Sequence, residues 1–355
     1  MRVLHLSNHC IFGNGNVHAA VDLACEQSNQ GHDVFFASSG GDFEGLLEEN
    51  GVRHIKIIHP NKSAPWLALP AALAIMEVCS KKKIEIVHAH MMTGAVLGWA
   101  ATRFLGIPLV TTVHNAFDKH AVLMGLGDRV IAVSAAVAKT MQSRGIPENK
   151  IRTVLNGTLG SPRTSGPMPE ISPLSRPSIT TVCGLHDRKG VRYLLMAFEA
   201  IHAQYPDVHL YILGEGPQEQ EYKSIAAAAH AHANIHFLGQ VRDPRPYLKQ
   251  SDVFVLASLQ DPCPLVIPEA REMGCAIVAT DVDGIPEMLA VGQAGTIVPP
   301  RDSVALAEAI HNLLSEPEAL RQSTTRSVAN LSFFDISRVV LDTINVYDST
   351  GRSAS

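Results

Sequence analysis

At residues 160–178 the sequence reads GSPRTSGPMPEISPLSRPS, a segment with five prolines and no periodic spacing of apolar residues. Proline and small polar residues neither continue a helix nor pair as a strand, so this composition indicates a linker. We therefore predict a first domain over residues 1–160, a linker over 161–177 and a second domain over 178–331. With 355 residues, the chain is long enough for two domains that each bury a core.

Both halves alternate short apolar runs with amphipathic stretches. In the first half the apolar runs, rich in β-branched residues, cover 2–7, 33–38, 53–58, 84–90, 108–114, 129–134 and 151–156. In the second half they are SITTVCG, VHLYILGEG, NIHFLGQ, DVFVLAS, CAIVATD and AGTIVPP. Strands that are apolar throughout and alternate with helices indicate parallel βαβ units with helices on both faces. The predicted fold class is α/β, with two tandem Rossmann-like domains that face each other across a cleft.

The last segment, 332–355, contains an amphipathic stretch with apolar or aromatic residues at helical spacing. Two placements are open for it. The helix either closes the second domain or crosses back to brace the first.

Composition excludes several classes of protein. The net charge of −5 argues against a nucleic-acid partner, and no apolar run reaches the roughly 20 residues that span a bilayer. The first strand begins at residue 2, which leaves no room for a secretory signal peptide. The six cysteines form no CxxC pair and lie in apolar segments, so we expect reduced, buried thiols in a cytoplasmic protein.

In open α/β sheets ligands bind beyond the carboxyl ends of the strands, so the residues that follow each strand are the candidates. Gly13 and Gly15 follow the first strand, where they form either an anion-binding turn or an ordinary tight turn. The third glycine of a dinucleotide fingerprint is replaced by His18, which argues against NAD.

Three histidines lie in or after strands of the first half. His88 and His90 form an HxH pair that could chelate a metal, but no third ligand is evident from the sequence, and core or cleft histidines are the favoured interpretation. His114 ends a strand and is a candidate active-site residue, with an ordinary loop histidine as the alternative.

In the second half, Arg188 and Lys189 follow the first strand and precede a glycine and a long helical pattern. Two cations at such a point suit a diphosphate, since a guanidinium binds two oxygens at once. A solvated pair at a helix start is the alternative. Gly184 and Gly214 also follow strands on this donor side, and the GEGP turn that contains Gly214 is mostly architectural.

The stretch DPCPLVIPEAREMGC (261–275) places one acid in a loop and another at a helix start. Proline is tolerated in a helix only within the first turn, so Pro268 predicts a start at about residue 265, with Glu269 in or near that turn and Asp261 in the preceding loop. Helix N-termini favour anions, and we expect the amides of Leu265, Val266 and Ile267 to face a diphosphate. The two carboxylates would then hold sugar hydroxyls, although either acid alone could simply decorate a helix end.

Two aspartates in DVD (281–283) raise a metal alternative, since such pairs hold Mg²⁺ or Mn²⁺ in some sugar transferases. Because the motif also precedes a helix start, we predict no metal and no other cofactor.

Ten segments in order resemble the GT-B glycosyltransferases of family 4 over nearly the whole chain. They are GHDV (31–34), the HAH strand, VTTVH, DRVIAVSAAV, IRTVLNG, the KG helix, LGEGP, FLG, SDVFVLAS and ATDVDGIPEML. The resemblance implies a retaining, metal-independent enzyme that uses a nucleotide sugar. It implies that Lys189 binds the diphosphate, that Glu269 is the second glutamate of EX7E and holds the ribose, that His114 lies near the donor sugar, and that Asn156-Gly157 lies near the hinge.

Some positions depart from the family pattern. Asp261 stands where the first glutamate of EX7E normally stands, and Gly184 replaces the usual phosphate arginine, for which Arg188 is the proposed substitute. Pro262, Pro264 and Pro268 remove three potential backbone donors.

The predicted function is sugar transfer from a nucleotide-sugar donor to a glycan, lipid-linked or small-molecule acceptor, with His114, Arg188, Lys189, Asp261 and Glu269 as the catalytic set. A nucleotide-sugar epimerase of the same architecture and a catalytically degenerate sugar-nucleotide-binding subunit remain as alternatives. Peripheral contact with the inner face of the plasma membrane is also open, because an apolar helical pattern at 66–76 precedes Lys81, Lys82 and Lys83. An ordinary core helix with a solvated end is slightly favoured there.

Overall fold

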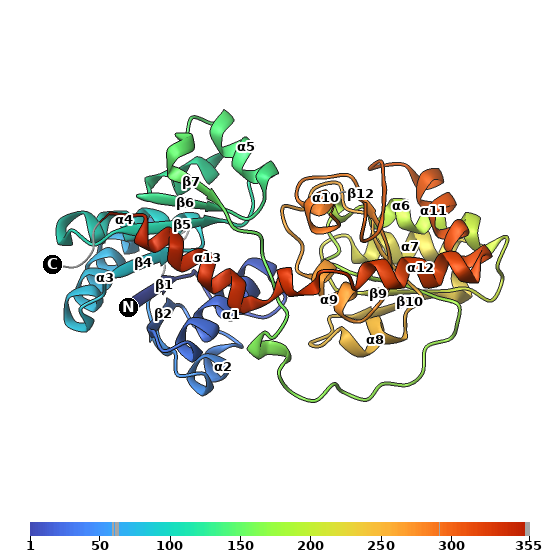
Figure 1. The fold of residues 1–355 in the computed structure, drawn as a ribbon, viewed down its shortest axis with the longest axis horizontal. Coiled ribbons are helices and arrows are strands. Elements are labelled where there is room, and N and C mark those ends of the chain that lie inside the picture. Colours follow the sequence, from blue (N-terminus) through green and yellow to red (C-terminus); the bar gives the residue numbers. More distant parts are fainter. Residues whose placement is uncertain (59, 61–63, 291, 352–355) are drawn as a thin grey trace. The chain divides into compact units, whose positions relative to one another are not determined.

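A computed structural model describes residues 1–58, 60, 64–290 and 292–351. The chain divides into two compact units (Figure 1). The first comprises residues 1–166 together with the C-terminal segment from Phe334, and the second comprises Pro167–Phe333.

The first unit is built on a seven-stranded parallel sheet in the order β3-β2-β1-β4-β5-β6-β7, within the described residues. Its strands are β1 (Arg2–Leu6), β2 (Asp33–Ser38), β3 (Arg53–Lys56), β4 (Ile86–Ala89), β5 (Leu109–Val113), β6 (Arg129–Ala132) and β7 (Ile151–Thr153). Its α-helices are α1 (Gly15–Asn29), α2 (Glu44–Glu49), α3 (Ala68–Lys82), α4 (Met92–Leu105), α5 (Ala135–Ser143) and α13 (Ile336–Asp348), and it has 3₁₀ segments at η1 (Pro65–Leu67), η2 (Lys119–Leu126), η3 (Glu148–Lys150) and η4 (Pro162–Thr164). Every predicted strand of this half is present, trimmed at one or both ends in all but one case.

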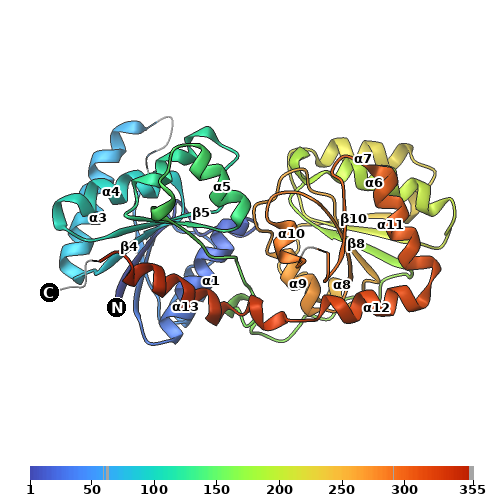
Figure 2. The same ribbon diagram turned by 45° about the horizontal axis from the view of Figure 1, so that its top comes forward.

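The second unit holds a six-stranded parallel sheet in the order β10-β9-β8-β11-β12-β13. Its strands are β8 (Ser178–Val182), β9 (His209–Leu213), β10 (Ile235–Gly239), β11 (Val253–Leu256), β12 (Ala276–Thr280) and β13 (Thr296–Val298). Its α-helices are α6 (Val191–His202), α7 (Glu219–Ala228), α8 (Arg245–Gln250), α9 (Val266–Glu272), α10 (Ile285–Met288), α11 (Ser303–Ser315) and α12 (Pro317–Ser327), with 3₁₀ segments at η5 (Asp187–Lys189), η6 (His232–Asn234) and η7 (Leu331–Phe334). Figure 2 shows α6, α7 and α11 on one side of this sheet and α8, α9 and α12 on the other.

The inner strands of each sheet are buried because helices cover both faces, whereas the edge strands β3 and β10 are partly exposed. All residues of β4, β5, β11 and β12 are buried, as expected for parallel strands between helical layers. The α/β class predicted from the continuous apolar runs is confirmed.

The last helix, α13, packs against α1 and β6 of the first unit. It adds Ile336, Val339, Val340, Val346 and Tyr347 to the apolar core around β1 and β4. The chain reaches it through a bridge in which Leu159 N–H donates to Phe334 O (3.0 Å) and Ile336 N–H donates to Leu159 O (2.9 Å). Of the two placements open from the sequence, the structure has the one that braces the first unit.

A close backbone contact explains why glycine occupies position 157 of the Asn156-Gly157 pair. A Cβ atom on Gly157 would lie 2.4 Å from the carbonyl oxygen of Phe334, closer than any side chain tolerates. The close passage of the C-terminal segment therefore requires glycine here.

Candidate functional site

Strand order in the second unit locates the site. The first strand, β8, lies between β9 and β11, so the chain moves outward in both directions from the β8–β11 pair. In doubly wound sheets ligands bind at this switch point, beyond the carboxyl ends of the two strands. Arg188 and Lys189 follow β8, and Asp261 follows β11.

Lys189 and Asp261 form a nearly buried ion pair at this point. The Lys189 ammonium donates to Asp261 Oδ2, and the two side chains are 12% and 6% exposed. The same carboxylate oxygen accepts a hydrogen bond from Ser258 Oγ at 3.0 Å. The structure therefore brings together two residues that the sequence assigned to different parts of the donor, and Asp261 fixes the position of the Lys189 cation.

The backbones of the two loops are also joined. Arg188 O accepts from Leu259 N–H (2.7 Å) and from Gln260 N–H (3.2 Å). Gly190 permits this approach, since its φ is +64° and a Cβ there would lie 2.0 Å from Ala257 O.

Asp283 holds the Asp261 loop from the other side. Its Oδ2 accepts a hydrogen bond from Asp261 N–H at 2.7 Å. One aspartate of the DVD motif thus has a structural role in the site that the sequence did not predict.

Glu269 lies in the first turn of α9 and is buried. The helix begins at Val266, as Pro268 predicted, and Asp261 lies in the loop before it. The expectation for the Ile267 amide is wrong in this structure. Ile267 N–H donates to Pro264 O at 3.2 Å, because the chain turns tightly after Pro264.

Arg271 ties α9 to neighbouring segments of the second unit. Its guanidinium is buried and donates to the carbonyl oxygens of Ser327 (2.7 Å), Met288 (2.8 Å) and Ala329 (2.5 Å). A buried cation that meets three carbonyls restrains the helix that carries Glu269. Nothing in the sequence distinguishes this arginine from a surface residue.

Among the predicted donor-side glycines, Gly214 is required by its backbone conformation and by a close contact. Its φ is +135°, and a Cβ would lie 2.0 Å from Cys183 O. At Gly184 a Cβ would lie 3.2 Å from the ring of His186, so a larger residue needs only a small shift of that side chain.

In the first unit, Gly13 does not present a free amide. Its N–H donates to His18 Nε2 at 3.3 Å, which corrects the anion-binding interpretation of this residue. Gly15 is the first residue of α1.

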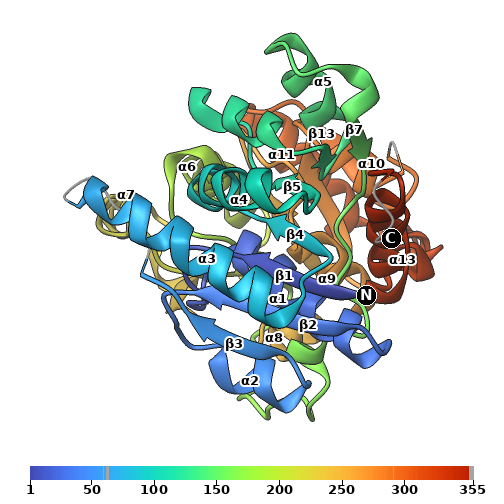
Figure 3. The same cartoon turned by 90° about the vertical axis from the view of Figure 1, so that its left-hand side faces the viewer.

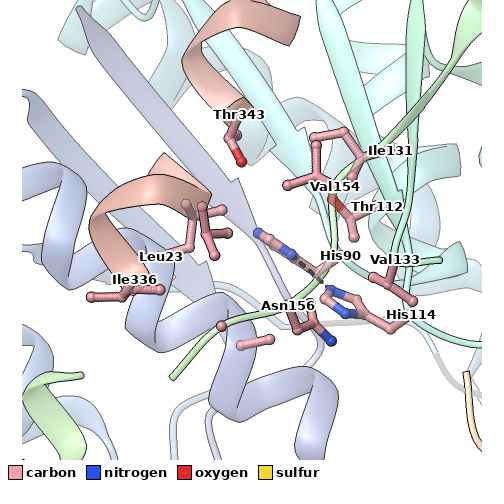
Figure 4. Close-up of a pocket in the computed structure, with 13 residues that line it drawn as sticks. Leu23, His90, Thr112, His114, Ile131, Val133, Val154, Asn156, Ile336 and Thr343 are labelled. Carbon is pink, nitrogen blue, oxygen red and sulfur yellow. Dashed lines mark hydrogen bonds between the residues drawn. The ribbon is translucent and has the colours of Figure 1, made fainter. Parts of the chain in front are cut away.

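His114 lies beyond the end of β5 in the wall of a pocket of the first unit. Figure 4 shows it beside Asn156, with a hydrogen bond to His90. His114 Nε2 is 3.1 Å from His90 Nδ1, and burial lowers the pKa of His114 to about 4, so the ring is neutral. Its Nδ1 is enclosed and has no hydrogen-bond partner among the described residues.

Two family models match the chain, one in each unit. Residues 13–158 match the model described as Glycosyltransferase Family 4, and residues 176–316 match the one described as Glycosyl transferases group 1.

Curated relatives agree with this assignment. The chain is 26% identical to a phosphatidyl-myo-inositol mannosyltransferase of Mycolicibacterium smegmatis, over 75% of this chain and 71% of that protein. It is 24% identical to an N-acetyl-alpha-D-glucosaminyl L-malate synthase of Bacillus anthracis, over 89% and 88%.

Solved structures show the same fold. Anabaena HepE in complex with UDP has a TM-score of 0.81 at 19% identity, covering 98% of this chain and 100% of that one. WaaG, a glycosyltransferase involved in lipopolysaccharide biosynthesis, has a TM-score of 0.76 at 13% identity, covering 99% and 100%. The chain belongs to the group 1, family 4 glycosyltransferases, which have the GT-B fold and transfer sugars from nucleotide-sugar donors.

Proposed function

We propose that the protein is a retaining, metal-independent glycosyltransferase whose donor diphosphate binds at the β8–β11 switch point of the second unit. The observation that carries this proposal is the Lys189–Asp261 pair at the carboxyl ends of two adjacent central strands. The crystal structures of HepE with UDP and with UDP-glucose favour a nucleotide-sugar donor of this kind.

Lys189 supplies the cation that the leaving diphosphate needs. Negative charge develops on the phosphate oxygens as the glycosidic bond breaks, and a cation held in place before the reaction stabilises that charge without reorganisation. Asp261 and Ser258 provide the preorganisation, because they hold the ammonium at the loop between the two strands. Arg188, whose backbone ties the same loops, is the proposed substitute for the arginine absent at Gly184.

Glu269 is assigned to the ribose. Glu269 lies in the first turn of a helix that Arg271 anchors, so the backbone that carries its carboxylate is held in place. Carboxylates accept hydroxyl hydrogen bonds strongly, which suits the two hydroxyl groups of a ribose. His114 in the first unit is assigned to the transferred sugar, and the acceptor hydroxyl approaches the face from which the phosphate leaves.

Retention and metal independence are tested together. With a donor that the enzyme turns over, we expect the release of nucleoside diphosphate to continue in excess EDTA, because Lys189 supplies the charge of a metal ion. Proton NMR recorded within the first minutes should show the released sugar in the anomeric configuration that it had in the donor. Loss of turnover in EDTA that Mg²⁺ or Mn²⁺ restores, or an inverted first product, would contradict this proposal.

The acceptor is proposed to lie at a membrane surface. Large apolar side chains stand exposed on η1, α3 and α4, where Trp66 is 70%, Leu69 69% and Phe104 81% exposed. Figure 3 shows α3 and α4 running beside each other, and the two helices pack together. The buried side of α3 carries Ala71, Ala72, Ile75 and Cys79. No helix within the described residues is long and apolar enough to span a bilayer.

Cations lie at the C-terminal ends of the same two helices. Lys81 and Lys82 lie in the last turn of α3, Lys83 caps it, and Arg103 lies in the last turn of α4. Exposed aromatic and leucine side chains next to cations suit an anionic lipid surface. The lipid acceptor named in the mycobacterial relative favours the same interpretation.

We expect the protein to float with vesicles that contain anionic lipid and to remain behind with purely zwitterionic ones. Trp66→Ser and Phe104→Ser should each weaken binding by about tenfold to a hundredfold, since burial of an aromatic side chain contributes about 1.5–3 kcal/mol. Lys81–Lys83→Ala should weaken it further at low salt. Met196→Ser, at a residue 53% exposed on the second unit, is the matched control. Equal flotation of all four variants, or none by the wild type, would end the membrane proposal.

A further inference from the structure

Three neighbouring strands of the first unit bring four histidines together. His5 lies on β1 opposite His88 on β4, and His90 and His114 lie just beyond β4 and β5. His5 Nδ1 is 2.9 Å from His90 Nε2, and His90 Nδ1 is 3.1 Å from His114 Nε2. The other nitrogen of His5, Nε2, is 2.8 Å from the amide oxygen of Gln27 on α1.

These rings are neutral, so each carries one N–H. Burial lowers the pKa of His5 to about 4, and it lowers the pKa of His90 well below its usual value. A neutral imidazole donates through one nitrogen and accepts at the other. In a row of such rings every N–H donates in the same direction along the row, and the group at one end of the row decides which direction that is.

The direction follows from Gln27. An amide oxygen only accepts, so His5 carries its proton on Nε2 and accepts at Nδ1. His90 must then donate from Nε2 to His5 and accept at Nδ1. His114 donates from Nε2 to His90, which leaves the lone pair on His114 Nδ1.

This lone pair lies at the end of the row of hydrogen-bonded histidines, and no residue of that row donates a hydrogen bond to it. His114 Nδ1 is enclosed, has no hydrogen-bond partner among the described residues, and belongs to a residue that lines the pocket shown in Figure 4. A buried acceptor without a partner is destabilising, and a bound hydroxyl that donates to it would remove that cost.

A second series of hydrogen bonds begins at the amide nitrogen of Gln27. Gln27 Nε2 donates to the Tyr347 hydroxyl (3.3 Å), which is 2.7 Å from His88 Nδ1, and His88 Nε2 is 2.6 Å from Thr112 Oγ1. A half-turn of the Gln27 amide would exchange donor and acceptor at both ends. The proton of every ring would then move to its other nitrogen, and His114 Nδ1 would become a donor.

A metal ion is a different use of the same cluster, since His5, His88 and His90 lie close enough to share one. However, both ring nitrogens of each of these histidines have a hydrogen-bond partner at 2.6–3.1 Å. A metal would have to displace several of these bonds. The geometry therefore favours a hydrogen-bonded relay.

We propose that Gln27 is a positioning residue that acts through His5 and His90 to hold His114 in the tautomer whose Nδ1 accepts a hydrogen bond. That the bond comes from a hydroxyl group of the transferred sugar rests on the proposed function. The tautomer itself does not. His114 touches the substrate in this account, whereas Gln27, His5 and His90 act at a distance.

The test is a nitrogen NMR experiment on the full chain labelled with ¹⁵N-histidine, in the absence of any substrate. Long-range proton–nitrogen correlations report which ring nitrogen carries the proton, and a His114→Gln variant identifies the His114 signals. We expect His5, His90 and His114 all to be protonated on Nε2. A proton on His114 Nδ1 in the wild type would overturn the proposal.

Gln27→Met keeps the length of the side chain and removes the amide. We expect it to move some or all of the His114 proton to Nδ1, whereas Gln30→Leu, at an exposed position near the same helix end, leaves the wild-type tautomer. An unchanged tautomer in the Gln27→Met variant would also overturn the proposal.

Turnover separates this inference from the function on which part of it rests. Loss of one neutral hydrogen bond, about 1 kcal/mol, should lower the donor hydrolysis rate of Gln27→Met by about fivefold. A shifted tautomer with unchanged turnover would overturn the contact between His114 and the sugar while the relay stands.

Discussion

We expect the Lys189→Met variant to release nucleoside diphosphate at least about a thousandfold more slowly than the wild-type protein, a loss of about 4 kcal/mol of transition-state stabilisation. Methionine keeps most of the side-chain length and removes the charge that would stabilise the leaving phosphate. The measurement is the initial rate of diphosphate release from the donor that the wild type hydrolyses.

Stability must be separated from catalysis in this variant, because loss of Lys189 removes the ammonium group that pairs with the buried Asp261 carboxylate and leaves it the hydrogen bond from Ser258. An uncompensated buried charge is destabilising. The double variant Lys189→Met/Asp261→Asn removes both charges and should recover melting temperature without recovering activity. Lys223→Met breaks an exposed ion pair with Glu219 in the same unit and is the matched control. A Lys189→Met rate within tenfold of the wild type would remove Lys189 from the catalytic set.

The second large effect is on stability. A chain that ends at residue 333 should lose the cooperative unfolding of its first unit. It lacks five buried apolar side chains of α13, each of which contributes about 1.5–3 kcal/mol. Their sum is comparable to the 5–15 kcal/mol by which a typical domain is stable. Urea unfolding followed by circular dichroism should show the transition of the second unit alone.

Point variants on α13 give a milder form of the same test. Tyr347→Ala removes a ring packed beside His88 together with its hydroxyl contacts, and should cost about 3–5 kcal/mol. Leu341→Ala, on the same helix but 60% exposed, should cost little. Equal effects of the two substitutions, or a truncated chain that unfolds like the full one, would show that α13 does not brace the first unit.

The sequence predicts elements well here and their pairings poorly. Continuous apolar runs identify the strands, because burial on both faces leaves little choice of residue. Pro268 locates the start of α9, because proline fits only the first turn. These signals are local, so a single sequence contains them.

The contacts that organise the site depend on strand order, which local patterns do not contain. Lys189 and Asp261 meet because β8 pairs with β11, although the two residues lie 72 positions apart. The role of Asp283 and the occupied amides of Gly13 and Ile267 depend equally on the path of each loop.

The histidine relay was missed for a similar reason. His88 and His90 alternate along one strand, which is also the pattern of ordinary core histidines. His90 contacts His5 of β1, and His5 in turn contacts Gln27 of α1, so only the tertiary structure brings these residues into line.

Every role proposed for the site residues depends on cleavage of the sugar–phosphate bond of a nucleotide sugar by this chain. The most direct measurement is the release of nucleoside diphosphate when the purified full chain is incubated with UDP-, GDP- and ADP-sugars in turn, with Lys189→Met alongside. We expect at least one donor to be hydrolysed slowly without an acceptor, and we expect the variant to release no diphosphate above the buffer blank. Failure to hydrolyse or bind any donor of the panel would contradict it, and binding without hydrolysis would favour a sugar-nucleotide-binding subunit that has lost catalysis.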